Sequence, residues 1–283
     1  MNKIYTSSGA FKNFSNLQKL FNYLNKNKIK NVELSGGSYN KNYKKVLTKN
    51  KNINFLFHNY FPVPKNSFVI NLASDNKKII KQSFYHIKKA IRLSKLFNLK
   101  YFSIHSGFLY DPDPKFLGKK MKLCKTFDRK KALSRFIKNI NEIGGYAKKY
   151  NVTILLENNN LEKYEYNLFK KSTVLMATSN ETIFIMKKTK DNVKLLVDVG
   201  HLKVASNTLK FSKINFLKNC SKWIEGYQLS DNYGLKDDNL PVKTTSWFWP
   251  HIKKNLKYYS LELYNQKMVT IKKNLKLIEN KIN

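Results

Sequence analysis

Residues 193–201 read VKLLVDVGH, an apolar run that ends abruptly in Asp198, Gly200 and His201. The run is rich in branched aliphatic residues and lacks clean polar alternation, which is typical of a strand buried on both faces. Strands of this kind belong to parallel sheets that helices cover. The polar residues mark the point where the strand gives way to a loop. The fold therefore depends on whether other segments repeat the pattern.

The pattern recurs along the whole chain in seven further segments: KIYTSSGAF (3–11), NVELSGG (31–37), INFLFHNYF (53–61), YFSIHSGF (101–108), TILLENNN (153–160), IEGYQLSDN (224–232) and YYSLELYN (258–265). Each is followed by a helical pattern or by a loop that contains one. Eight βα units predict an α/β fold, a single (β/α)8 TIM barrel over residues 1–283. A doubly wound open sheet gives no reason for eight units, and no G-x-G-x-x-G follows the first run.

Helical periodicity fills most of the gaps between these runs. Leu17, Leu20, Phe21 and Leu24 fall on one stripe within residues 16–27. The other expected helices cover residues 77–98, 130–150, 181–190, 212–223 and 268–280, and a helical segment is expected in the loop near 249–257. Ser74 or Asp75 is the expected cap of the helix at 77–98.

Composition limits the class of protein. The chain of 283 residues is 42% hydrophobic, which suffices for a large core and argues against disorder. No stretch approaches the roughly 18 apolar residues of a membrane span, and the start shows no secretory signal. Cys124 and Cys220 lie far apart, which favours a reducing compartment over a disulfide scaffold. These features predict a cytoplasmic protein with no membrane partner.

The formal net charge of +36 is of the kind that nucleic-acid-binding proteins carry. However, Arg92, Arg129 and Arg135 are the only arginines, whereas phosphate and base recognition usually uses the bidentate guanidinium fork. The lysines are spread among Asn, Ile, Tyr and Phe, as AT-biased coding would produce. We therefore expect no specific nucleic-acid partner. The positive field would instead attract anionic ligands such as phosphorylated sugars.

The C-terminal ends of barrel strands carry the chemistry, because the βα loops converge there. Seven of the eight expected strands end in a carboxylate, imidazole or amide: Glu33, His58, His105, Glu157, Asp198 with His201, Gln228 with Asp231, and Glu262. Any one of them has an ordinary explanation, such as a rim histidine or a helix cap. Together, converging carboxylates would repel unless a cation or shared protons intervened. Oxygen ligands with imidazole suit Mn²⁺, Mg²⁺, Co²⁺ or Zn²⁺.

These strand ends, HNYFP, IHSGF, LLENN, VDVGH, QLSDNYG and LEL, resemble those of the xylose isomerase-like TIM-barrel superfamily. That group includes sugar and sugar-phosphate isomerases and epimerases, and the endonuclease-four-type AP endonucleases. The resemblance covers nearly the whole chain and depends most on the D-x-G-H motif and on the glutamate of the fifth strand. It implies a divalent ion held by Glu157, Asp198, Gln228 and Glu262. It also implies that the two glutamates shuttle protons on the substrate, with His201 beside it.

Two positions depart from the superfamily pattern, which usually has His at position 228 and often at 239, where this chain has Gln228 and Asn239. A glutamine carbonyl ligates hard ions but binds Zn²⁺ poorly compared with imidazole. The expected cofactor is therefore Mn²⁺, Mg²⁺ or Co²⁺ rather than Zn²⁺. Both changes also argue against the trinuclear zinc chemistry of the nuclease branch.

Further residues are expected around the substrate: Glu33, His58, Asn158, Asp231, Asp238, Asn239, Trp247 and Trp249. The aromatic segment SWFWPH (246–251) would stack on a sugar ring, or alternatively close the barrel mouth or a subunit interface. The insertion at 111–125 is long enough for a lid, and a plain solvated loop is its alternative.

The sequence thus predicts a sugar or sugar-phosphate isomerase/epimerase that works through an enediolate with a divalent ion. Glu157 and Glu262 would remove and return the proton, while His201 and His105 orient hydroxyls. Two alternatives stay open: an AP-endonuclease-like phosphodiesterase, and a catalytically silent sugar-binding barrel suggested by Gln228 and Asn239. A homo-oligomer is compatible with all three.

Overall fold

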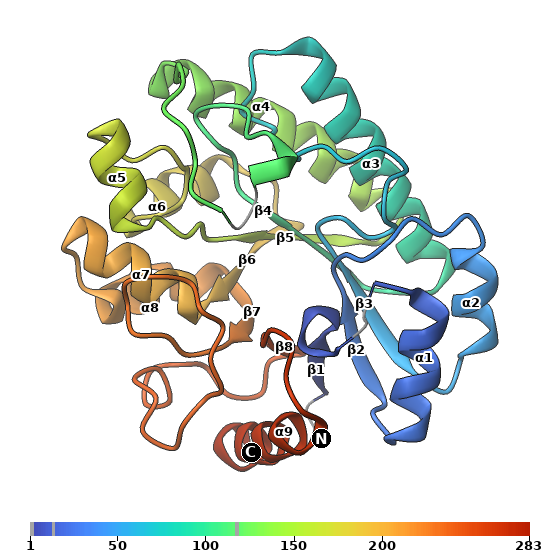
Figure 1. The fold of residues 1–283 in the computed structure, drawn as a ribbon. Helices are drawn as coiled ribbons and strands as arrows, with labels where there is room; N and C mark the ends of the chain where they lie inside the picture. Colours follow the sequence, from blue (N-terminus) through green and yellow to red (C-terminus); the bar gives the residue numbers. More distant parts are fainter. Residues whose placement is uncertain (1–2, 13–14, 117–118) are drawn as a thin grey trace.

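The computed structural model describes residues 3–12, 15–116 and 119–283, and shows a closed barrel of eight parallel strands (Figure 1). Each strand pairs with the next in sequence, and β8 closes the ring against β1. The strands are β1 (Ile4–Ser7), β2 (Asn31–Leu34), β3 (Asn54–His58), β4 (Tyr101–His105), β5 (Thr153–Glu157), β6 (Val193–Asp198), β7 (Ile224–Leu229) and β8 (Tyr258–Leu261). The predicted (β/α)8 TIM barrel is confirmed.

Helices surround the strands (Figure 1). The α-helices are α1 (Leu17–Lys26), α2 (Tyr43–Lys49), α3 (Lys77–Leu96), α4 (Arg129–Lys148), α5 (Lys163–Phe169), α6 (Ser179–Lys188), α7 (Val199–Leu209), α8 (Lys213–Cys220) and α9 (Met268–Ile282). Short 3₁₀ turns are η1 (Ser8–Ala10), η2 (Pro114–Phe116) and η3 (Ser221–Trp223). None of the helices in the described ranges combines the length and apolar character that crossing a membrane requires.

Most helix predictions are confirmed. The four residues of the predicted stripe on α1 are all buried. The predicted cap of α3 is wrong: Asn76 holds that position, and its side chain accepts a hydrogen bond from the Lys78 amide. Ser74 is instead buried, and its hydroxyl donates to Asp111.

Three helices and one loop differ from the prediction. The helices α2, α5 and α7 were not among the expected helices. In α7 the buried residues lie on every side, from Val199 to Ser206, so no one-sided apolar stripe marks the helix. Conversely, the expected helical segment near 249–257 is absent: the described residues between β7 and β8 form turns and an isolated bridge, Asp231↔Leu240.

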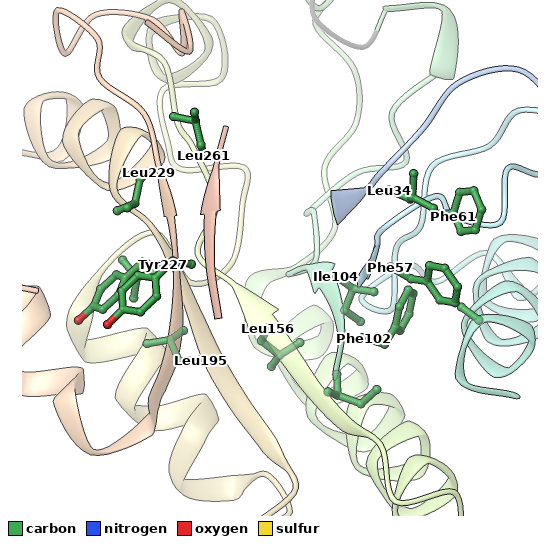
Figure 2. Close-up of a cluster of buried hydrophobic side chains, with 14 of the residues drawn as sticks. Leu34, Phe57, Phe61, Phe102, Ile104, Leu156, Leu195, Tyr227, Leu229 and Leu261 are labelled. Atoms are coloured by element: carbon green, nitrogen blue, oxygen red, sulfur yellow. The ribbon is translucent and has the colours of Figure 1, made fainter. Parts of the chain in front are cut away.

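Strand side chains alternate between two separate cores. Leucines, isoleucines and aromatic residues such as Phe57, Ile104, Leu156 and Tyr227 pack outside the strands against the helices (Figure 2). Their neighbours along the strands point inward, and the apolar ones form a plug of Tyr5, Leu56, Tyr101, Leu155, Leu196 and Tyr258. Nearer the C-terminal end, the inward positions become polar. That change of layer creates the candidate site.

Candidate functional site

The strand ends gather at one mouth of the barrel, as parallel strands in a closed ring must. A cavity of about 750 Å³ opens there, and His105, His201 and Asp237 form part of its wall. Residues from the insertion after β4, including Phe116, Lys119 and Met121, form another part. The insertion thus reaches the cavity, although its residues 117–118 lie outside the described residues.

Glu157, at the end of β5, is the centre of the cluster. Its carboxylate lies 2.9 Å from His201 Nδ1, 3.4 Å from His105 Nε2 and 3.6 Å from His58 Nε2. Burial raises the pKa of Glu157 to about 7, Asp198 and Glu33 add to the increase, and contact with His201 opposes it. A carboxyl with this pKa can accept and return a proton near neutral pH.

The three imidazoles have different charge states. Burial and the nearby His201 lower the pKa of His58 to about 3. Burial, His58 and His201 likewise hold the pKa of His105 well below its usual range. Burial also opposes charge on His201, but Asp198 and Asp237 outweigh it and raise its pKa well above the usual range. The cluster therefore holds one imidazolium and two neutral rings, and neutral imidazole is the form that binds metals.

Asp198 and Glu262 complete the acidic part of the cluster. Asp198 ends β6, and its Oδ1 accepts a 2.7 Å hydrogen bond from the His201 amide, which caps α7. Its carboxyl group lies close to that of Glu262, the residue after β8. Burial and then Asp198, Glu157 and Glu33 raise the pKa of Glu262 well above its usual range. Two neighbouring buried carboxylates repel each other unless a shared proton or a cation lies between them.

The donor atoms left over in this cluster suit a divalent cation. Asp198 Oδ2, Gln228 Oε1 and Glu262 Oε2 are buried and have no hydrogen-bond partner among the described residues. Ligand atoms of two groups, His58–His105–Glu157 and Glu157–Asp198–His201, also lie within 4.8 Å of one another. Buried unpaired anionic oxygens are costly unless a proton or a metal compensates them.

Gln228 occupies the position expected for a metal ligand, next to Asp198 in the β6–β7 register. It is fully buried, and its Nε2 donates a 3.2 Å hydrogen bond to Glu33 Oε1. Glu33 is also fully buried and accepts from the Tyr258 hydroxyl. Burial raises the pKa of Glu33 to about 7. Glu33 therefore binds protein groups in the barrel interior, and its predicted contact with substrate stays a prediction.

Asp237 is the main residue that the sequence prediction missed. Its Oδ2 lies 3.2 Å from His201 Nε2 and also accepts from Asn239 Nδ2 at 3.3 Å. Asp238, which was predicted instead, is partly exposed, and its carboxylate lies 3.4 Å from Lys236 Nζ. Both residues stood in the same acidic pair, so the sequence located the loop but not the side chain that turns inward.

Asp231 and Asn158 lie near the site but are already engaged. Asp231 accepts from Lys203 Nζ and from Ser246 Oγ, both at 2.7 Å, which anchors the long loop. Asn158 binds the backbone of Asp198 through both ends of its amide. These bonds give both residues a role in holding strand ends together. Their predicted contact with substrate stays a prediction.

The two tryptophans of the SWFWPH segment pack rather than line the cavity. Trp249 is buried in the outer core, and its Nε1 donates to the Lys243 carbonyl at 2.6 Å. Trp247 is half-buried against the same core, with Lys213 Nζ 5.2 Å from its ring centre. This packing favours the alternative in which the segment closes the barrel mouth over the one in which it stacks on a sugar ring.

The chain is similar in sequence to one protein family and in fold to several solved structures. The family described as "Xylose isomerase-like TIM barrel" matches residues 21–259. A D-tagatose 3-epimerase-like protein is structurally similar, with a TM-score of 0.70, 18% identity, and coverage of 99% of this chain and 96% of the other.

Two further structures are similar at lower identity. D-psicose 3-epimerase from Clostridium cellulolyticum H10 has a TM-score of 0.63, 14% identity and coverage of 97% and 89%. An AP endonuclease of family 2 from Brucella melitensis has a TM-score of 0.63, 12% identity and full coverage of both chains, 100% and 100%. No curated protein matches the sequence significantly. At these identities the structural likeness concerns the fold alone.

Proposed function

We propose that this chain, which belongs to the xylose isomerase-like TIM-barrel family, is a sugar or sugar-phosphate isomerase or epimerase that uses a divalent metal ion. The observation that carries the proposal is the pair Glu157 and Glu262. Glu157 ends β5 and Glu262 follows β8, on either side of the Asp198 strand β6 in the barrel order, and burial raises the pKa of each. Two such carboxyls are suited to remove a proton from a substrate carbon and return one.

Glu157, Asp198, Gln228 and Glu262 would hold the ion, because each contributes a buried oxygen to the cluster. A bound divalent ion supplies a Lewis acid that polarises carbonyl and hydroxyl oxygens and stabilises an enediolate. Three carboxylates and an amide carbonyl are hard ligands, so Mn²⁺, Mg²⁺ or Co²⁺ is favoured over Zn²⁺.

The chain's own residues would divide the remaining work. Glu157 removes the proton next to the carbonyl, and Glu262 delivers a proton to the enediolate. His105 and His201 face the cavity and would donate to or accept from substrate hydroxyls. Asp237 keeps His201 charged and oriented through its contact with Nε2. The insertion after β4 would restrict water access to the same cavity.

Proton transfer gives a direct test. Purified protein loaded with Mn²⁺ would be incubated with ketoses, aldoses and their phosphates in D₂O, and the sugars analysed by NMR. We expect one substrate to be interconverted with deuterium incorporated at the carbon next to the carbonyl. The matched variant Glu157→Gln should incorporate none. Sugar binding without exchange in the wild-type protein would instead support the silent barrel.

One observation favours a second candidate, a phosphodiesterase of the AP-endonuclease type. His58 and His105 approach Glu157 closely enough to share a metal ion with it. The two positions without imidazole, Gln228 and Asn239, argue against it, because zinc is held poorly by amides. We therefore expect no Zn²⁺-dependent incision of abasic-site DNA at physiological salt. Robust incision would reverse the order of the two candidates.

A further inference from the structure

A chain of buried hydrogen bonds crosses the barrel interior from Gln228 to His58 and passes through Glu33. We propose that Glu33 is a positioning residue that sets the direction of every hydrogen bond in this chain. By doing so, it makes Gln228 present its oxygen and His58 present its Nε2 lone pair to the acidic cluster. The inference rests on the metal site of the proposed function and adds to it the residue that orients one ligand, Gln228, and the imidazole that faces another, Glu157.

At one end, Glu33 fixes the amide of Gln228. The amide nitrogen Nε2 of Gln228 donates the 3.2 Å hydrogen bond to Glu33 Oε1, so the NH₂ group is the end of the amide that faces Glu33. The amide oxygen is then the atom left over. It is buried and lacks a partner among the described residues, beside Asp198 in the sheet register. In this orientation the amide presents its oxygen, which can bind a cation, and not its NH₂ group, which would repel one.

At the other end, two hydroxyl groups link Glu33 to His58, and each of them has only one hydrogen to donate. Tyr258 donates its hydrogen to Glu33 Oε2. In the 3.0 Å contact between Tyr258 and Ser103, Ser103 must therefore be the donor. Ser103 then has only its lone pair for the 3.0 Å contact with His58 Nδ1, so Nδ1 carries the hydrogen. The Nε2 lone pair of His58 is left facing Glu157 at 3.6 Å.

The packing around the chain holds this arrangement. Glu33, Gln228, Ser103 and Tyr258 are fully buried, so bulk water does not compete for their bonds. Gly226 makes room for Tyr258: a Cβ at that position would lie 2.7 Å from Tyr258 Cβ and 2.9 Å from the Tyr258 carbonyl oxygen. A side chain at 226 would therefore displace the tyrosine that links Glu33 to His58.

The test replaces Glu33 by glutamine, which offers one acceptor oxygen where the carboxylate offers two. Mn²⁺ binding would be measured by calorimetry near pH 8, and the His58 tautomer by ¹⁵N NMR of the metal-free protein. We expect Glu33→Gln to weaken Mn²⁺ binding by about tenfold or more, because substitution of a residue that orients a metal ligand commonly has an effect of this size. The His58 signals should lose the character of a single Nδ1–H tautomer.

The chain offers a matched control at the far end of the barrel. There Tyr101 donates a 2.8 Å hydrogen bond to Glu225 Oε1, so Glu225→Gln makes the same substitution in a similar tyrosine–glutamate pair away from the cluster. It should change neither readout. If Glu33→Gln does not fold, Tyr258→Phe, which breaks the link to His58 and leaves Glu33 bonded to Gln228, should alter the tautomer in its place.

The outcomes separate the inference from the proposed function. Unchanged Mn²⁺ affinity together with an unchanged His58 tautomer in Glu33→Gln would overturn the inference while leaving the metal site intact. A change in only one readout would overturn the claim that the chain acts as a unit. If the wild-type protein binds no divalent ion, the proposed metal-dependent function fails. The tautomer measurement then decides the inference alone.

Discussion

The two ends of the barrel share one architecture but differ in how their buried polar groups are satisfied. The N-terminal end holds the larger hollow, about 850 Å³, with Lys3, Lys51, Lys100 and Lys257 on its rim. Its floor is made of the tyrosines and leucines of the inner plug. The Tyr101–Glu225 hydrogen bond is complete there. At the C-terminal end the hollow is smaller, yet buried oxygens of Asp198, Gln228 and Glu262 lack partners.

We infer from this difference that unpaired buried oxygens, rather than cavity volume, mark the candidate site. A pocket whose polar lining atoms are already hydrogen-bonded gains no specific stabilisation from a ligand. A cluster with unsatisfied acidic oxygens gains the removal of a desolvation penalty when a proton or cation arrives. The comparison therefore predicts that changes at the C-terminal end affect activity and metal binding, whereas changes at the N-terminal end affect stability only.

The largest expected effect is the loss of turnover in Glu157→Gln. The amide cannot act as the base, so the isomerisation rate should fall by about 10³-fold. Initial rates with saturating Mn²⁺ on the substrate found in the D₂O screen would measure it. Glu225→Gln, at the opposite end, should stay within about twofold of the wild-type rate. Equal losses in both variants would break the distinction between the two ends.

The second effect is stabilisation by metal, and it should depend on pH. Folding raises the pKa of Glu33 and Glu157 from 4.5 to about 7, so between these values the folded protein keeps protons that the unfolded chain loses. These groups therefore stabilise the metal-free protein less as pH rises through that window. A cation binds the ionised cluster, so its effect should be largest above about pH 7.

Thermal unfolding with and without Mn²⁺ would measure this effect. At a free Mn²⁺ concentration about 100 times the dissociation constant, binding adds about 2.7 kcal/mol, which corresponds to roughly 4–5 °C in Tm for a domain of this size. The shift should shrink near pH 5, where protons occupy the cluster. A shift of equal size at both pH values would show that the ion binds elsewhere.

A smaller effect is expected from Gln228→His. Imidazole is the stronger ligand for Zn²⁺ and Co²⁺, so zinc affinity should rise by about tenfold, or about 1.4 kcal/mol. Parallel titrations of both proteins with Mn²⁺ and Zn²⁺ would measure the change in preference. Identical affinities for every ion would place Gln228 outside the ligand set and leave the cluster to its three carboxylates.

The smallest effect is expected at the N-terminal end. Tyr101→Phe removes the hydrogen bond to Glu225, which should lower the free energy of unfolding by about 1 kcal/mol. Urea denaturation would measure it, and Mn²⁺ affinity would serve as the internal control. A loss of metal affinity in this variant would mean that the two ends are coupled through the inner plug.

The fold was predictable because each strand is a short apolar run that ends in a polar residue. A helix without a one-sided apolar stripe, such as α7, has no comparable signal in the sequence. The cap of α3 was missed by one residue because Ser74, Asp75 and Asn76 are all good caps. Which of them bonds depends on Asp111, which is distant in sequence and holds the Ser74 hydroxyl.

The site was predictable at the level of strand ends but not of contacts. Glu33 and Glu157 both end a strand in the same way, yet one turns to Gln228 and Tyr258 and the other to three histidines. Tyr258 begins β8 and gave no sign in the sequence that its hydroxyl reaches Glu33. Such contacts depend on strand register and on the space that Gly226 leaves, which only the closed barrel defines.

The double role of Asp198 limits which substitutions a redesign of this barrel can use. Its carboxylate caps α7 with Oδ1 and presents Oδ2 to the cluster, so helix and site share one side chain. Alanine at this position would remove the helix cap and the cluster oxygen together, so the two effects could not be separated. Asparagine keeps a cap acceptor of similar strength while removing the negative charge. A redesign of the acidic cluster can therefore pass through Asp198→Asn, because that step preserves the helix cap while the cluster is rebuilt.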